Sequence, residues 1–160
     1  MLLLALAIAA NGVSPALASG RGPAVALAPE TLDLERGARG ALWRSGSALA
    51  NEAARYIGSA KFTSLPGAWC ADAVSFWLTR VGKPPLPNRM AGSALAYGPR
   101  VANPQPGDLV VIRTRRGPEG HVGIVVAVRG DAVDIVSGNW GGRVARATIS
   151  RAQVTAFVGT

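Results

Sequence analysis

The spacing of apolar residues divides the chain into a helical part followed by a strand-rich last third. Apolar positions between 41 and 58 approximate a helical stripe, and those between 70 and 81 recur every three or four residues. Residues 83–107 are rich in proline, which predicts an extended connection over the surface. Beyond them, β-branched runs alternate with glycine-containing turns, and these runs cover residues 108–113, 121–128, 132–136, 143–149 and 154–158.

The order of these elements predicts an α+β domain over residues 41–160. Because the connections between the β-branched runs are short, the strands should form an antiparallel sheet. Helices first and strands afterwards place N-terminal helices against that sheet. Residues 19–40 are rich in Gly, Arg, Pro and Ala without a steady period, which favours a linker or a flexible arm.

The first eighteen residues have the pattern of a secretory signal. Residues 2–10 form an unbroken apolar run, too short for a membrane-spanning helix, which needs about 20 apolar residues. Pro15 breaks the run, and Ala16-Leu17-Ala18 has the small-x-small pattern of a cleavage site, although a Lys/Arg segment is missing before it. We expect a signal peptide over residues 1–18 and a secreted or periplasmic protein. A buried N-terminal helix is the alternative.

Composition narrows the chemistry because the chain holds one cysteine, Cys70, and one histidine, His121. These counts exclude an intramolecular disulfide framework and any zinc site built from several Cys or His ligands. The nine acidic residues are scattered, so we expect no metal and no other cofactor. An unpaired cysteine in an exported protein indicates either dimerisation or a reactive thiol.

The positions of three residues suit a thiol hydrolase. Cys70 lies at the predicted start of a helix, where the helix dipole lowers a thiol pKa from about 8.5 and free N–H groups can bind an oxyanion. His121 opens a predicted strand, and one strand-turn-strand step brings Asn139 back beside it, able to accept from the imidazole. Taken singly, each has a plainer interpretation: a small buried cysteine, a structural histidine and a turn-forming asparagine.

Four segments occur in an order that carries a family resemblance: residues 69–77 around Trp69-Cys70-Ala71, then 106–111, 120–125 and 137–144. With the helix over 41–57, they resemble the CHAP family of peptidoglycan-cleaving cysteine amidases and endopeptidases, in the NlpC/P60-like papain-fold superfamily. The resemblance implies a papain-like α+β fold with Cys70 as nucleophile, His121 as base and Asn139 as orienting residue. Many family members carry Glu two residues before that Asn. Here the residue is Ser137, which leaves Asn139 to orient His121 alone.

The implied activity is hydrolysis of amide bonds in cell-wall peptides, as an N-acetylmuramoyl-L-alanine amidase or an endopeptidase. Two alternatives stay open: a non-catalytic wall-binding module of the same fold, and a secreted toxin or phage-type lysin. Trp69 and Trp140 are candidates for substrate binding, although aromatic residues beside a catalytic helix more often belong to the core. We expect a monomer.

The charge balance adds a possible class of partner. Seventeen Lys and Arg against nine Asp and Glu give a formal net charge of +8, and Arg113, Arg115 and Arg116 cluster in one segment. Such a surface attracts anionic wall polymers, while a merely solvated charged surface is the plainer interpretation. A nucleic-acid partner is not expected, because no binding motif is present and residues 121–128 are too apolar for base stacking. We therefore expect peptidoglycan as the partner and no stable membrane span.

Overall fold

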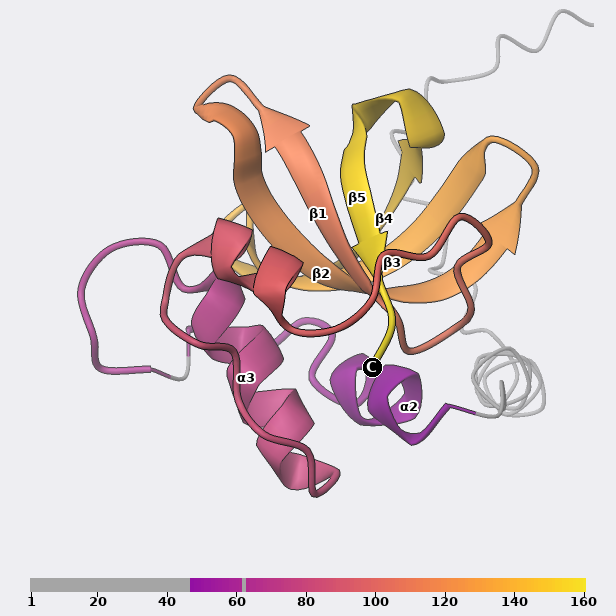
Figure 1. Ribbon diagram of the computed structural model, residues 1–160. Helices are drawn as coiled ribbons and strands as arrows, with labels where there is room; N and C mark the ends of the chain where they lie inside the picture. The colour runs from indigo at the N-terminus through magenta and orange to yellow at the C-terminus, as the bar shows by residue number, and fades with distance from the viewer. Residues whose placement is uncertain (1–46, 62) are drawn as a thin grey trace, which may run out of the picture.

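The computed structural model describes residues 47–61 and 63–160, in which two α-helices lie on one side of a five-stranded sheet (Figure 1). The predicted signal peptide and linker, and the first part of the predicted helix over 41–58, lie outside the described residues. In chain order the elements are α2 (Ala48–Ala54), α3 (Cys70–Arg80), the 3-10 helix η1 (Ala91–Ala96), β1 (Leu109–Thr114), β2 (Gly117–Arg129), β3 (Ala132–Trp140), β4 (Arg143–Ser150), the 3-10 helix η2 (Arg151–Gln153) and β5 (Val154–Val158).

The sheet has the strand order β4-β3-β2-β1-β5, and every neighbouring pair is antiparallel. Three consecutive hairpins join β1 to β4, and the chain then returns so that β5 pairs with the other edge of β1. The predicted α+β class and the antiparallel sheet are therefore confirmed. Within the described residues, no helix is long and apolar enough to cross a membrane.

The helical part differs from the prediction in two places. The first helix ends at Ala54, and the chain turns before Gly58, whose φ of 93° lies in the left-handed region. The segment 83–107 is not extended throughout, since it contains η1, which buries the small side chains of Ala91 and Ala94. Small residues between prolines allow a short turn to pack where a bulkier segment would stay on the surface.

Two strands are longer than predicted, and both extensions bear on the site. A two-residue turn pairs Thr114 with Gly117, so β2 begins before His121 and places it within the ladder opposite Ile112. β3 continues to Trp140, so Asn139 lies in a strand instead of a glycine-rich turn. The turn itself is formed by Gly141 and Gly142, both with positive φ.

Alternating apolar residues give the sheet two buried faces. Val111, Val122 and Val136 face the helices and pack with the core of α3, which includes the fully buried Trp77. On the other face a second cluster forms from β1, β2 and β3 together with both edge strands: Val110, Ile112, Val125, Val133, Ile135, Ile149 and Phe157. Because β4 and β5 contribute to the same cluster, the sheet curves toward this face.

A close approach of β3 to α3 depends on Gly138. A Cβ atom at this position would lie 2.4 Å from the Cβ of Ala73 and 2.8 Å from a ring carbon of Trp69. Neither neighbour can easily retreat, because Ala73 and Trp69 are themselves buried. The missing side chain therefore allows the strand residue that follows, Asn139, to reach the start of the helix.

Substituting Gly138→Ala should lower the free energy of unfolding by about 1–3 kcal/mol, because the added methyl overpacks the contact between β3 and α3. Urea unfolding followed by circular dichroism measures this effect. Gly159→Ala is the matched control, since the nearest atoms to its new Cβ would be at 3.5 Å, an ordinary contact distance. Equal effects of the two substitutions would contradict the packing argument.

Candidate active site

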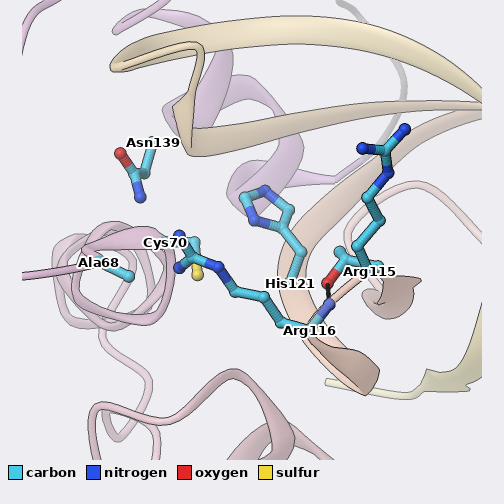
Figure 2. A pocket seen from close by; sticks show the side chains of 8 residues that line it. Ala68, Cys70, Arg115, Arg116, His121 and Asn139 are labelled. Atoms are coloured by element: carbon cyan, nitrogen blue, oxygen red, sulfur yellow. Dashed lines mark hydrogen bonds between the residues drawn. The ribbon is translucent and has the colours of Figure 1, made fainter.

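A cavity of about 360 Å³ lies between the start of α3 and the strands β1, β2 and β3 (Figure 2). Its described lining consists of Ala68, Cys70, Thr114, Arg115, Arg116, Gly120, His121 and Asn139. The three residues singled out in the sequence thus reach one cavity from a helix and two neighbouring strands. Cys70 is the first residue of α3, His121 belongs to β2 and Asn139 to β3.

The thiol of Cys70 is free and only 5% exposed. No side chain caps the helix start at Trp69, and backbone N–H groups of Val122, Ala71 and Cys70 itself act to lower the thiol pKa. Burial outweighs them and raises the pKa above its usual value. The prediction of a lowered pKa is therefore wrong, because it considered the helix dipole without the desolvation of the sulfur. At neutral pH the resting group is the thiol.

The imidazole of His121 is also neutral at rest. It is partly buried beside β3, and this burial lowers its pKa to about 4. A neutral imidazole has one nitrogen that donates and one that accepts a proton. At neutral pH the cavity therefore contains an uncharged acid, the thiol, and an uncharged base, the imidazole.

The hydroxyl of Ser137 fixes which ring nitrogen is the base. Its Oγ lies 2.6 Å from Nε2 of His121, 2.7 Å from the carbonyl oxygen of Val122 and 3.1 Å from that of Gly138. Carbonyl oxygens only accept, so the single hydroxyl proton is donated to one of them, and Oγ accepts from Nε2–H. Nδ1 is then unprotonated, and Figure 2 shows it on the side of the ring that faces Cys70.

Ser137 is the residue that sequence reasoning undervalued. The family resemblance marked its position as that of a Glu in many members and left the orientation of His121 to Asn139 alone. In the structure the imidazole is hydrogen-bonded to Ser137, and among the described residues no hydrogen bond joins it to Asn139. The available signal was the two-residue spacing, which puts positions 137 and 139 on one face of a regular strand.

The backbone of Asn139 has a φ of 59°, in the left-handed region. Among the described residues other than glycine, it is the only one with a positive φ. The register between β3 and β4 shifts between Ser137 and Trp140, which marks a β-bulge at this point. Asparagine tolerates the left-handed region better than most residues, and the bulge turns its side chain into the cavity wall beside the start of α3 (Figure 2). Its catalytic role stays a prediction.

The two candidate tryptophans differ in exposure. The ring of Trp140 contacts His121 edge to face, with centroids 5.2 Å apart, and 36% of the residue is exposed, so it covers the imidazole from solvent. Trp69 is 3% exposed and lies against Gly138 in the core. Trp69 therefore supports the wall of the site and leaves little surface for substrate, whereas Trp140 remains available for substrate binding.

Alkylation of Cys70 by iodoacetamide should be slow at pH 7, and its rate should level off at a higher pH than in the unfolded chain, because burial raises the thiol pKa and limits access. Mass spectrometry measures the rate without ambiguity, since the chain contains one cysteine. The same protein unfolded in urea is the control and should react with the pH dependence of an ordinary thiol. Rapid labelling of the folded protein below pH 8 would contradict this prediction.

Candidate metal ligands do not gather in the part of the chain that the structure describes: no group of three or more His, Cys, Asp or Glu side chains lies close together there.

The fold is a papain-like α+β fold. One helix carries the thiol at its start, and this helix packs on an antiparallel sheet that carries the imidazole. Residues 61–139, which include Cys70, His121 and Asn139, match the family model of the CHAP domain.

Solved structures with the same fold include that of Ly7917, which is similar with a TM-score of 0.50 and 23% identity over 69% of this chain and 60% of that chain. Ly7917 with the hydrolyzing product of MDP gives a TM-score of 0.49 and 23% identity over 69% of this chain and 61% of that chain. This chain spans about three fifths of those chains. A comparison with curated proteins found no match.

Proposed function

We propose that this protein hydrolyses amide bonds in the peptide part of peptidoglycan, with Cys70 as the nucleophile and His121 as the general base. The observation that carries the proposal is that the single cysteine and the single histidine of the chain line one cavity in a CHAP domain. The family comprises peptidoglycan-cleaving amidases and endopeptidases, and both bond types are within this proposal.

The neutral resting pair suggests how the first step proceeds. Nδ1 of His121 takes the thiol proton while Sγ of Cys70 attacks the carbonyl carbon, so the thiolate exists only as the new C–S bond forms. The C–N bond then breaks as the imidazolium returns its proton to the leaving amine. Water attacks the resulting thioester and passes a proton to His121. The C–S bond breaks, and that proton returns to the sulfur.

Developing negative charge on the sulfur meets backbone donors at the start of α3 and on β2. The N–H groups of Cys70, Ala71 and Val122 act on the sulfur of Cys70 and lower the energy of its charged form. Such preorganised donors, in a site shielded from water, stabilise charge on the sulfur, and the N–H groups at the helix start are the candidates for binding the oxyanion. Asn139 lines the same cavity, and its assignment as the orienting residue rests on the family resemblance.

Digestion of purified sacculi followed by mass spectrometry tests the proposal. An amidase releases whole stem peptides, whereas an endopeptidase leaves shortened peptides on the glycan, so one experiment detects activity and identifies the bond. Binding to sacculi without released fragments would support a non-catalytic wall-binding module and would overturn the proposed hydrolysis.

Export is part of the proposal and rests on the signal-like pattern of residues 1–18. Expression of the full chain in a bacterial host and N-terminal sequencing of the extracytoplasmic product should give a chain that starts after Ala18. Retention of the uncleaved chain in the cytoplasm would contradict it.

A further inference from the structure

An arginine-bearing hairpin forms one wall of the cavity. Arg115 and Arg116 make the two-residue turn between β1 and β2, and the backbone N–H of Arg116 donates to Oγ1 of Thr114 at 3.1 Å. A Cβ atom on Gly120 would lie 1.9 Å from the same Oγ1, so glycine at this position lets the hairpin close. The backbone that carries Arg116 is therefore held in place by its own turn.

Arg116 extends from this turn toward Cys70, whereas Arg115 extends in another direction (Figure 2). Arg116 also lines an adjoining groove with Met90, Gly92, Ser93, Gly117, Pro118 and Glu119. Its guanidinium group therefore stands at the junction between the thiol cavity and the surface along which a longer substrate would continue.

The charge of Arg116 has no acidic counterpart in the part of the chain that the structure describes. Other arginines form ion pairs, such as Arg89 with Asp72 at 2.7 Å and Arg146 with Asp134 at 2.7 Å. None of the described residues that line the thiol cavity is acidic. Glu119 lines the adjoining groove. The thiol cavity thus offers an unpaired guanidinium group to a ligand.

We propose that Arg116 binds a carboxylate of the peptide substrate close to the scissile amide and so makes the enzyme prefer acidic stem peptides over amidated ones. This inference rests on the proposed function. A guanidinium group suits the task because its planar donors match a carboxylate through two parallel hydrogen bonds. A cavity of about 360 Å³ admits only a short stretch of peptide, so the recognised carboxylate lies near the bond that is cut.

The test compares two synthetic stem peptides that differ only in whether their side-chain and α-carboxylates are free or amidated. Arg116→Gln should lower kcat/KM for the free-acid peptide about tenfold, mainly through KM, since one charge-assisted hydrogen-bonded pair is lost. The amidated peptide should be cleaved equally well by both enzymes. Arg113→Gln is the matched control, because Arg113 is exposed on β1, carries the same charge and does not line the cavity.

Failure of this inference is distinguishable from failure of the proposed function. Equal cleavage of both peptides by the wild-type protein would show that Arg116 does not recognise a carboxylate. A full preference for the free acid in Arg116→Gln would show the same. If the wild-type protein cleaves neither peptide, calorimetric binding of both peptides to Cys70→Ala, with and without Arg116→Gln, still decides. Tighter binding of the free acid that disappears with Arg116→Gln supports the inference, and equal binding overturns it.

Discussion

Replacing Cys70 with alanine should abolish peptidoglycan cleavage, with a loss in kcat of about 10⁴-fold or more, as for other hydrolases that lose their nucleophile. The chain has no second thiol that could form the covalent intermediate. Release of soluble fragments from purified sacculi, followed by turbidity and mass spectrometry, measures the loss.

The substitution is small enough to separate chemistry from folding. Cys70 behaves in the core as a small apolar side chain, so alanine at this position should keep the far-ultraviolet circular dichroism spectrum and most of the unfolding free energy. Binding of Cys70→Ala to sacculi should also persist. Undiminished lysis by this variant would overturn the proposed mechanism, whatever its stability.

The strands could be predicted from the sequence because their signal is local. The β-branched runs and the glycines between them determine where each strand lies, and the short connections make the sheet antiparallel. The helix predicted over 70–81 occupies Cys70–Arg80 for the same reason, since one apolar face is repeated within it. The structure of residues 83–107 could not be predicted in the same way, because η1 is stabilised by burial against distant strands and not by its own sequence pattern.

The site could be predicted as a set of residues but not as a set of contacts. That Cys70, His121 and Asn139 come near one cavity follows from the position of Cys70 at a helix start and from the antiparallel pairing of the strands that carry His121 and Asn139. Which side chain meets the imidazole depends on a bulge in β3, and this places Ser137 on Nε2. The pKa values of Cys70 and His121 depend on burial by several segments, so a local helix dipole gave the wrong sign for the thiol.

Replacing His121 with glutamine should lower kcat/KM by about 10²–10⁴-fold, the usual contribution of a positioned general base. Glutamine retains a polar group of similar size but has no group that accepts a proton at neutral pH. If a different residue removes the thiol proton, His121→Gln will retain most of the activity. Peptide cleavage at saturating and limiting substrate, with unfolding curves as a check on folding, distinguishes these outcomes.

The pH profile of the wild-type enzyme gives an independent measurement of the same group. Catalysis needs neutral His121, whose pKa is lowered to about 4 by burial, so kcat/KM should stay level from pH 7 down to about 5. Below about pH 4 it should fall roughly tenfold per pH unit, as the protonated imidazole can no longer take the thiol proton. A fall in kcat/KM that begins near pH 6.5 would instead indicate an imidazole in contact with water. That result would conflict with the position of His121 between Ser137 and Trp140.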